Sequence, residues 1–395
     1  PDVKLLLAHL SLLSNEHNSI AWTRIMKGVH AFPSHALARR FNWKLKQLAL
    51  SPSDFLLYSE SCYTAEFLRA YDEEEIVVFD TETTGLDVFN DDIIEIAAIR
   101  LKGGEVVGEP LALYIETDKP ILPMLGDKEN PMYAIYHEKM STGELLSPSD
   151  ALRRFLAYVG SSPILGHNAN YDYNILDNNL QRYCNDTMQA HDIRCFDSLK
   201  LIRLLAPSLH SYKLESLLET FQLAGVNSHQ AIDDVKATVS LVRLCAEKAR
   251  EKQAQQEAFI HHPKVKPFAN VLRSNYGERY REAVNRLYKL STDHEPALVS
   301  ELSTAYNAFR SDGLINDIPR LDYILRYLRI DMLTDEPVAN ALAPQLSQYV
   351  MDINTLKEAD FCNSKSILER IYVTTVHKAK GLEFDNVIIF DAADG

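Results

Sequence analysis

Hydrophobic residues recur with a helical period at the start of the chain and with a strand-like pattern after it. Residues 3–13 and 34–50 place apolar side chains on one face of a helix, and Ser34 stands where it can cap the second segment. The pattern changes at residues 73–81, where a continuous apolar run is typical of a buried strand. The sequence therefore predicts a helical segment followed by a domain that contains a β-sheet.

The β-rich part begins with three strand patterns and continues with helices that alternate with short strands. Residues 92–101 and 106–117 follow the first strand and are separated by the turn-like pair Gly103 and Gly104. The segments after them are helix 149–160, strand 162–167, helix 171–184, strand 192–197, and helices 198–207, 212–223 and 231–258. This order predicts an α/β domain with a mixed five-stranded sheet and helices.

These patterns divide the chain into four segments. We expect a helical segment over residues 1–70, an α/β domain over 71–250, a second, nearly all-helical segment over 251–370, and a strand–loop–strand segment over 371–395. A length of 395 residues agrees with two or three domains. The chain starts at Pro1 without a methionine and stops just after an apolar run, so we expect it to be a piece of a longer protein.

Composition excludes several classes of protein. Aliphatic and aromatic residues are too frequent for a disordered chain, and no apolar run approaches the roughly 20 residues that span a bilayer. The five cysteines form no CxxC pair, which favours a reducing cytoplasm over a disulfide scaffold or a structural zinc site. The net charge of −14 gives no general attraction to nucleic acid, so such contacts must come from local basic patches or from metal ions that bridge acidic residues and phosphate.

An acidic pair ends the first predicted strand. Asp80 and Glu82 are two residues apart, and the two-residue period of a strand places both carboxylates on the same face. Two like charges this close repel one another, and a hard divalent cation such as Mg²⁺ or Mn²⁺ relieves the repulsion. The pair therefore indicates a metal site, and the alternative is an acidic loop that binds nothing.

A second group of polar residues follows the short strand at 162–167. Asp172 lies near the start of the next helix, where a carboxylate could bind a metal but could equally complement the helix dipole. His167 and Asn168 precede it and could serve only to stabilise the turn. This group therefore indicates function only in combination with the acidic pair.

A histidine and an aspartate lie close together at the start of the last long helix, which we expect Asn227 or Ser228 to cap. His229 precedes Asp234 by five residues, and two residues that far apart on one helix point to different sides. We therefore place His229 on the entering loop and Asp234 on the helix, with Asp233 turned away from the site. The alternative is a surface histidine beside acidic residues.

Four carboxylates and a histidine in one α/β domain together predict a catalytic metal site. Four carboxylates can bind two divalent ions about 3.5–4 Å apart, an arrangement used for displacement at a phosphodiester. One ion would lower the pKa of a water molecule, and the other would stabilise the leaving 3′ oxygen. His229 could accept the proton of the water near neutral pH, since the unperturbed pKa of histidine is about 6.5.

These motifs resemble those of the DEDDh 3′–5′ exonucleases of the DnaQ-like proofreading type, over about residues 75–245. The matching residues are Asp80, Glu82, Thr83, Thr84 and Gly85 in the first motif, Gly166, His167, Asn168 and Asp172 in the second, and His229 and Asp234 in the third. The resemblance implies a ribonuclease-H-like fold, two Mg²⁺ or Mn²⁺ ions held by Asp80, Glu82, Asp172 and Asp234, and His229 as the general base. It also implies that Thr83, Leu86 and Asn168 approach the terminal nucleotide.

A further motif lies near the end of the chain. Residues 375–384 read Thr-x-His-x-Ala-Lys-Gly-Leu-Glu-Phe and resemble motif V of UvrD/Rep-type superfamily 1 helicases, although an ordinary basic turn is the alternative. Residues 1–70 are similar to the helical accessory (2B) region of such helicases, with Phe32-Pro33-Ser34-His35 in place of the usual Pro-Arg-Gly pattern. The resemblance implies an exonuclease domain flanked by mostly helical 2B-like segments in a helicase-like DNA repair or processing protein. No G-x-x-x-x-G-K-[ST] occurs, so we expect no ATPase activity and expect separate motor domains as a partner.

The sequence thus predicts a cytoplasmic, metal-dependent 3′–5′ exonuclease that releases nucleoside monophosphates from DNA, with single-stranded 3′ ends as the expected substrate. Two alternatives stay open. The nuclease fold could only bind a nucleic-acid end, in which case substitution of Asp80 would change binding alone. The substrate could also be RNA, because no residue is identified that reads a 2′-hydroxyl. Tyr171 and Tyr173 could stack on bases or pack in the core.

Overall fold

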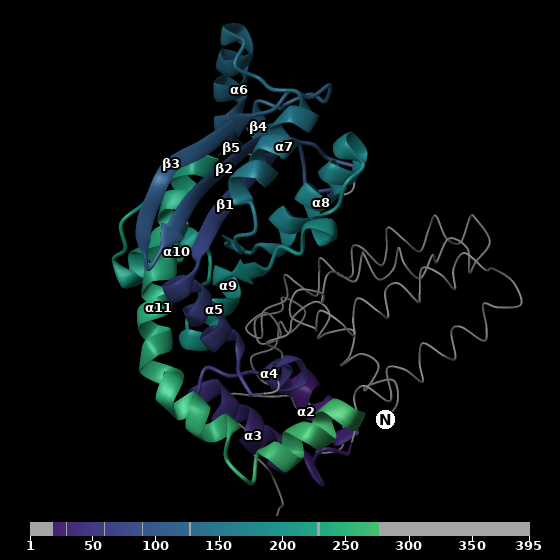
Figure 1. The fold of residues 1–395 in the computed structure, drawn as a ribbon, viewed down its shortest axis with the longest axis vertical. Helices are drawn as coiled ribbons and strands as arrows, with labels where there is room; N and C mark the ends of the chain where they lie inside the picture. Colours follow the sequence, from purple (N-terminus) through teal and green to yellow (C-terminus); the bar gives the residue numbers. More distant parts are fainter. Residues whose placement is uncertain are drawn as a thin grey trace, which may run out of the picture.

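A long helix joins two parts of the described molecule (Figure 1). The computed structural model describes residues 19–275, except residues 29, 59, 89, 126–127 and 227–229. Helix α11 (Ala231–Ile260) starts beside a β-sheet and ends among helices that include α2 (Ser19–Gly28) and α3 (His35–Gln47). One part is therefore a sheet covered by helices, and the other is a helical lobe.

Five strands form one mixed sheet in the order β3-β2-β1-β6-β7. Strand β1 (Glu75–Thr83) is antiparallel to β2 (Ile93–Lys102), which is antiparallel to β3 (Glu105–Tyr114). On its other side, β1 pairs in parallel with β6 (Ile164–Gly166), and β6 pairs in parallel with β7 (Cys195–Asp197). The predicted mixed five-stranded sheet is therefore confirmed, with β1 at its centre.

Alternate residues of β1 face two hydrophobic cores on opposite sides of the sheet. The helices of this part are α5 (Tyr63–Glu73), α6 (Pro131–Thr142), α7 (Pro148–Val159), α8 (Asn170–Cys184), η1 (Met188–His191), α9 (Ser198–Leu205) and α10 (Leu214–Phe221). Ile76 and Val78 join the core that α5, α9, α10 and α11 cover. Val77 and Phe79 join the core that α7 and α8 cover. The continuous apolar run of β1 thus results from burial on both faces.

The helical lobe combines segments that are far apart in the sequence. Helices α2, α3 and α4 (Pro52–Leu57) pack against the end of α11 and against the helical residues 266–275. The buried Gln256 of α11 stabilises this contact, because its amide nitrogen donates hydrogen bonds to the backbone oxygens of Leu48 and Ala49 at 2.8 and 3.3 Å. Residues that precede the sheet and residues that follow it therefore meet in one lobe.

Helix ends agree with the sequence at one site and differ at another. Ser34 caps α3 as predicted, since its hydroxyl oxygen accepts the N–H of Leu37 at 3.3 Å. The predicted cap of the last helix by Asn227 or Ser228 was wrong. Helix α11 begins at Ala231, as the pattern predicted, but its N-cap residue is Gln230, which has an extended backbone and makes no side-chain capping hydrogen bond.

Three elements between β3 and α7 were not predicted. Strands β4 (Met124–Leu125) and β5 (Lys128–Glu129) form a short antiparallel hairpin, and α6 follows it. The ends of α6 carry ordinary signals, with Asn130 at the N-cap, Pro131 in the first turn and Gly143 in the left-handed conformation after the last turn. Helix α6 buries only part of its length, which explains why the hydrophobic pattern did not indicate it.

The predicted segment boundaries at residues 70 and 250 fall inside α5 and α11, since both helices pass from the lobe to the sheet. Residues 1–18, most of 251–370 and all of 371–395, including the helicase-like motif at 375–384, lie outside the described residues. No helix in the described part of the chain is both long and apolar enough to cross a membrane.

Candidate metal centre

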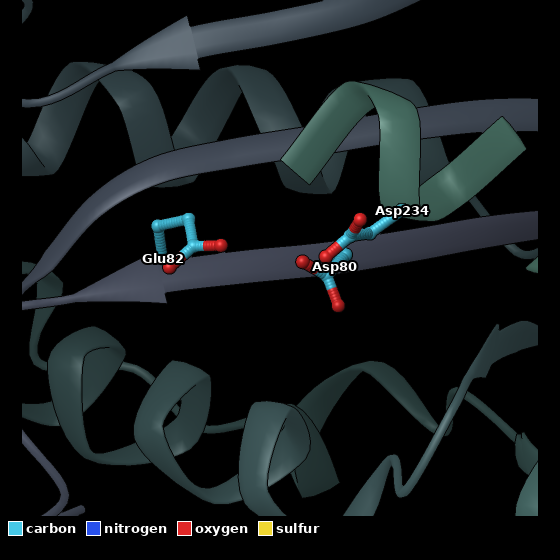
Figure 2. A group of neighbouring side chains, drawn as sticks. All are labelled: Asp80, Glu82 and Asp234. Carbon is cyan, nitrogen blue, oxygen red and sulfur yellow. The ribbon is translucent and has the colours of Figure 1, made fainter. Parts of the chain in front are cut away.

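Three carboxylates from two elements converge near the end of the central strand (Figure 2). Asp80 and Glu82 lie on β1 and alternate with residues that face the α8 side, so both face α11. Asp234 lies in the first turn of α11. One oxygen from each of the three lies within 4.8 Å of the others. The convergence that the sequence predicted for these three residues is therefore present, and we call them the carboxylate group.

The fourth predicted carboxylate, Asp172, approaches from the opposite face of the sheet. It lies in the first turn of α8 and is buried. Its Oδ1 accepts hydrogen bonds from the N–H and the hydroxyl of Thr81, at 3.1 and 2.6 Å. Thr81 faces this side because it alternates with Asp80 and Glu82 along β1. Thr81 thus fixes one oxygen of Asp172 beside the strand that carries the carboxylate group.

The acids of this region raise one another's pKa. Burial is the largest cause of the pKa of Asp80 lying well above its ordinary value, and the charge of Asp172 is the next. Burial, followed by the charges of Glu95 and Asp234, raises the pKa of Glu82 to about 8. Burial also raises the pKa of Asp172 to about 7, although hydrogen bonds, including both from Thr81, oppose it. These acids are therefore costly to ionise together at neutral pH unless a positive charge joins them.

A divalent cation fits this set of donors. All of them are carboxylate oxygens, the ligands that the hard ions Mg²⁺ and Mn²⁺ prefer. Among the described residues, no lysine, arginine or histidine forms an ion pair with Asp80, Glu82 or Asp172. The negative charge of these side chains is therefore left for a ligand to neutralise.

A fifth carboxylate, which the sequence analysis missed, lies beside the group. Glu95 of β2 pairs in register with Glu82 and is only 1% exposed. Its Oε2 accepts the N–H of Ala231 at 3.3 Å, at the start of the helix that carries Asp234. Burial raises its pKa, which this hydrogen bond opposes. The available signal was a single acid inside the apolar run 93–99, which we interpreted only as a strand.

The structure describes only one of the two histidines in these motifs. His229, the predicted general base, lies outside the described residues. His167 lies between two partners, with Nδ1 3.0 Å from the hydroxyl of Ser198 and Nε2 3.1 Å from the backbone oxygen of Tyr212. Burial lowers the pKa of His167 and so favours its neutral form. This histidine stabilises the turn before α8, which is one of the interpretations left open above.

The turn after β1 carries two residues that were predicted to approach the substrate. The hydroxyls of Thr83 and Tyr171 both donate to the backbone oxygen of Gly85, at 2.8 and 2.6 Å, and they lie 2.7 Å from each other. A Cβ atom at Gly85 would lie 2.5 Å from Oδ2 of Asp91, so a larger residue at this position would have to displace the carboxylate of Asp91. The fixed turn leaves the side chain of Leu86 83% exposed. Tyr171 thus uses its hydroxyl to hold the turn.

Asn168, the third residue predicted to approach the substrate, lies on a second turn. It is exposed and adopts a left-handed conformation with a φ of 64°. Its backbone N–H donates to Oδ1 of Asp197 at 2.9 Å, and the same oxygen accepts the N–H of Leu199 at the start of α9. Asp197 therefore fixes the backbone of this turn and leaves the side chain of Asn168 at the surface.

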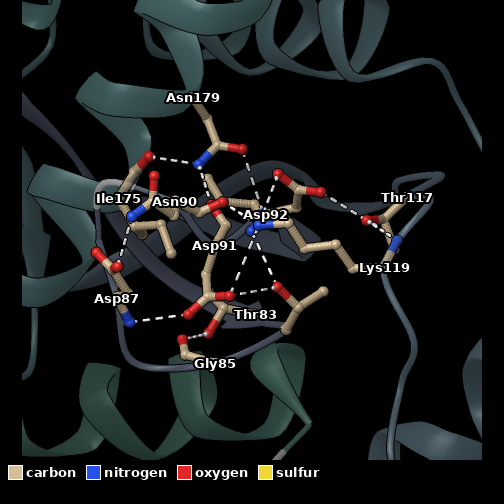
Figure 3. A network of polar contacts seen from close by, with 12 residues as sticks. Thr83, Gly85, Asp87, Asn90, Asp91, Asp92, Thr117, Lys119, Ile175 and Asn179 are labelled. Atoms are coloured by element: carbon tan, nitrogen blue, oxygen red, sulfur yellow. Dashed lines mark hydrogen bonds and ion pairs between the residues drawn. The ribbon is translucent and has the colours of Figure 1, made fainter.

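A network of polar contacts fixes the loop between β1 and β2 (Figure 3). Asp91 accepts hydrogen bonds from the hydroxyl of Thr84 at 3.1 Å and from the N–H of Asp87 at 2.8 Å. Asp92 accepts a charged hydrogen bond from Arg182 of α8 at 2.9 Å. Asp91 therefore stabilises the loop that carries Leu86, and Asp92 joins this loop to α8.

A family match defines the class of this domain. The sequence model of the RNase_T family, described as Exonuclease, matches residues 77–242. The matched segment contains the carboxylate group, Asp172 and Glu95. Residues 77–242 therefore carry an exonuclease domain.

Proteins of several bacteria are similar to stretches of comparable length in this chain. The DNA polymerase III PolC-type proteins of Clostridium perfringens and Bacillus subtilis are each 30% identical to it, over 184 and 192 residues. These stretches cover 46% and 47% of this chain but only 12% of each relative. The chain thus corresponds to a small part of the length of these relatives.

Solved structures of exonuclease I also match part of the chain. The E. coli enzyme in complex with a dT13 oligonucleotide is 23% identical, with a TM-score of 0.37, and the match covers 49% of this chain and 45% of that one. Exonuclease I from Methylocaldum szegediense is 22% identical, with a TM-score of 0.34 and coverage of 47% and 42%. The likeness extends over less than half of each chain.

Proposed function

We propose that this chain is a metal-dependent 3′–5′ exonuclease that hydrolyses phosphodiester bonds at the 3′ end of DNA and releases nucleoside monophosphates. The observation that carries the proposal is the carboxylate group, with its oxygens within 4.8 Å and Asp172 beside it. The exonuclease domain supports hydrolysis, and the likeness to PolC-type DNA polymerases supports DNA as the substrate.

In this proposal Asp80, Glu82, Asp172 and Asp234 hold two divalent ions, Mg²⁺ or Mn²⁺. A bound pair of ions supplies a water molecule of lowered pKa and positive charge for the leaving oxygen. The protein contributes the ionised carboxylates, one of which Thr81 orients. His229 accepts the proton of the attacking water, because a histidine titrates near neutral pH.

We assign the positioning of the terminal nucleotide to Thr83, Leu86 and Asn168. The proposal is supported by the exposed Leu86, which projects from a turn that the hydroxyls of Thr83 and Tyr171 hold in place. An exposed apolar side chain on a fixed turn can pack against the face of a base, whereas a paired and stacked base offers no free face. The expected substrate is therefore a single-stranded or frayed 3′ end.

A time course on a 5′-labelled single-stranded DNA oligonucleotide tests the proposal. With Mg²⁺ or Mn²⁺ the chain should produce a ladder that shortens from the 3′ end, and both Asp80→Ala and EDTA should abolish it. Cleavage that survives chelation would contradict the metal mechanism. An RNA oligonucleotide of the same sequence tests the exoribonuclease alternative. Binding of the oligonucleotide without cleavage would identify a non-catalytic module instead.

We also propose that the exonuclease domain is an insertion in the accessory region of a UvrD/Rep-type helicase-like protein of DNA repair or processing. Helices α5 and α11 lie at the two ends of the domain and both lead into one helical lobe, as an insertion requires. The motif V-like residues 375–384 agree with this, and residues 1–70, 71–250, 251–370 and 371–395 are the corresponding segments.

Because the sequence has no P-loop, DNA-stimulated ATP hydrolysis should be absent until the motor domains are supplied as a partner. Turnover of ATP by this chain alone would contradict the proposed insertion in a helicase-like protein.

A further inference from the structure

One region of the helical lobe has a charge opposite to that of the whole chain. Residues 19–53 contain six lysines and arginines and no aspartate or glutamate, although the net charge of the chain is −14. Four of the six lie exposed on α3: Arg39, Arg40, Lys44 and Lys46. None of the four is ion-paired with a carboxylate in the part of the chain that the structure describes. Their charge is therefore available to a ligand.

An exposed tryptophan lies in the middle of these cations. Trp43 of α3 is 63% exposed, while Leu45 is buried on the opposite side of the helix. Arg39 and Arg40 precede Trp43 by four and three residues, and Lys46 follows it by three. Residues three or four apart are neighbours on a helix surface, so cations flank the indole along the helix in both directions. We call Arg39, Arg40, Trp43, Lys44 and Lys46 the α3 face.

Two cations on the sheet side of the molecule, unlike those of the α3 face, form ion pairs with neighbouring acids. Lys236, two residues after Asp234 on α11, lies 3.1 Å from the carboxylate of Asp233. Arg182 of α8 lies 2.9 Å from the carboxylate of Asp92. Both charges are offset by neighbouring acids, whereas no carboxylate of the described residues forms an ion pair with the cations of the α3 face. A surface that attracts phosphate is thus found on the lobe, away from the acidic site.

We propose that the α3 face is a second, sequence-tolerant binding surface for single-stranded nucleic acid. Cations that follow the phosphates, combined with an aromatic side chain on which a base can stack, are the features that bind single strands without sequence preference. The inference rests on the proposed exonuclease function for the direction of the strand. With the 3′ end at the carboxylate group, the α3 face holds nucleotides on the 5′ side.

The length of α11 sets the distance between the two surfaces. Asp234 of the carboxylate group and Gln256, which bonds to Leu48 directly after α3, lie 22 residues apart on this helix. At 1.5 Å per residue the separation is about 33 Å. A stacked strand advances about 3.4 Å per nucleotide, so roughly ten nucleotides are needed to reach from one surface to the other. Shorter oligonucleotides should use the carboxylate site alone.

The two tryptophans of the chain allow a direct test. Trp22 is 2% exposed and Trp43 is 63% exposed, so quenching of the protein fluorescence by an oligonucleotide reports on Trp43. The Asp80→Asn protein, which should not cleave, is titrated with a 20-nucleotide oligo-dT. We expect quenching that Trp43→Phe removes, and a loss of affinity of about tenfold in Trp43→Ala, as for one lost base stack.

Charge is tested at the same positions with a matched control. Arg39→Gln/Arg40→Gln should weaken binding and reduce the slope of log K against log salt by about 1.4, since each phosphate contact of a single strand contributes about 0.7. Arg39→Lys/Arg40→Lys keeps both charges and should keep the slope. In the cleavage-competent protein, the Gln pair should slow degradation of a 30-nucleotide substrate but not of a 6-nucleotide one.

Several results would overturn the inference. Unchanged affinity and salt slope in the Gln pair, or fluorescence that does not respond to the oligonucleotide, would refute it. Lower thermal stability of the Gln pair with full DNA binding would mean that the α3 face contacts protein instead, and equal binding of a blunt duplex would refute the single-strand assignment. Cleavage by the wild-type chain without quenching would refute binding at the α3 face and leave the proposed function intact. Quenching without cleavage would support binding at the α3 face and refute the proposed function.

Discussion

Two pairs of acidic residues lie on either side of the turn after β1: Asp80 with Glu82 on the strand, and Asp91 with Asp92 before β2. The surroundings of the two pairs differ in charge, because cations lie beside the second pair only, among the described residues. Burial, together with other carboxylates, raises the pKa of both Asp80 and Glu82. Burial alone would also raise the pKa of Asp92, but hydrogen bonds from Thr117 and Tyr183 and the nearby cations lower it overall. The ionised form of the first pair is therefore disfavoured in the absence of a ligand, whereas Asp92 is stabilised in its ionised form by the protein itself.

The difference distinguishes an acidic residue that stabilises the fold from acidic residues that are available to bind a ligand. Asp92 is joined to Arg182 and so ties the loop between β1 and β2 to α8. Asp80 and Glu82 face Asp234 across a short distance with no cation paired to them among the described residues. Acids held in this unfavourable state are typical of sites where a metal or a proton transfer uses them. The account therefore predicts opposite responses to the same substitution in the two pairs.

The largest expected effect is on cleavage. Asp80→Asn keeps the size of the side chain but removes a charge from the carboxylate group, so the rate of 3′ cleavage should fall by roughly 10³-fold or more. Asp92→Asn removes a charge that the protein already neutralises, and the rate should stay within about tenfold of wild type. Initial rates on one labelled oligonucleotide give the comparison, and similar losses in both variants would contradict it.

Substitution of the proposed base should have the next largest effect. His229→Ala removes the group that accepts the proton, and turnover should fall by roughly 10²–10⁴-fold. Because both acidic pairs are unchanged, binding of Mn²⁺ should be retained. Single-turnover rates and Mn²⁺ titration of the same protein separate the two effects, and an unaltered rate would remove His229 as the base.

Stability should respond in opposite directions in the two pairs. Asp92→Asn leaves Arg182 and two hydroxyl partners without their charged acceptor, and the free energy of unfolding should decrease by about 1–3 kcal/mol. In EDTA, Asp80→Asn relieves repulsion between carboxylates and should leave the free energy unchanged or increase it. Urea unfolding of the three proteins is the measurement. A metal-free Asp80→Asn protein less stable than wild type would show that Asp80 supports the fold.

The two pairs should also change the stability in opposite directions as the pH is varied. Folding raises the pKa of Glu82 from 4.5 to about 8 and that of Asp172 from 3.8 to about 7. The folded state therefore retains protons that the unfolded state releases, and these groups should lower the stability of the metal-free protein as pH rises from about 4 to 8. Asp92, with its lowered pKa, contributes stability above pH 4 that is lost at more acidic pH.

Thermal unfolding at pH 5 and pH 8, with EDTA and with Mg²⁺, tests this sign. Mg²⁺ should raise the unfolding temperature more at pH 8, where fewer protons compete with the ion for the carboxylates. At 100 times its dissociation constant it should add about 2.7 kcal/mol to the free energy of unfolding. Equal stabilisation at both values of pH would argue against binding to these acids.

The smallest effect is expected at the turn between the two pairs. Tyr171→Phe removes the hydroxyl that donates to the backbone oxygen of Gly85 and contacts Thr83. The free energy of unfolding should decrease by about 0.5–1.5 kcal/mol. Cleavage should weaken modestly, mainly through KM, because Leu86 then projects from a looser turn. Steady-state kinetics on a single-stranded oligonucleotide would show a change confined to kcat if Tyr171 acted on the chemistry instead.

The parts of the fold with one dominant hydrophobic period were predictable from the sequence. Strand β1 and helix α11 follow from continuous and helical patterns that burial on specific faces produces. Helix α6 was missed because it buries few residues, chiefly Met132 and Tyr136, so no apolar face stands out. The start of α11 at Ala231 was predicted, but its capping residue was not, because Gln230 occupies the N-cap position although Asn227 and Ser228 are the better capping residues by type.

The candidate site was predictable where it depends on local geometry. The period of a strand was enough to place Asp80 and Glu82 together. The position of Asp234 opposite them depends on how α11 packs on the sheet, and only the motif resemblance anticipated it. Glu95 could not be found, because a lone acid in an apolar strand does not show by itself which group it will meet. The neutralised state of Asp92 likewise depends on Arg182, 90 residues away in the sequence.

Titration calorimetry with Mn²⁺ at neutral pH tests the central claim most directly, because it asks which acidic pair holds the metal. The wild-type chain and Asp92→Asn should bind two ions with similar affinity, and Asp80→Asn should lose at least one of them. Undiminished binding by Asp80→Asn, or binding lost only in Asp92→Asn, would contradict the assignment of the metal centre to Asp80, Glu82, Asp172 and Asp234.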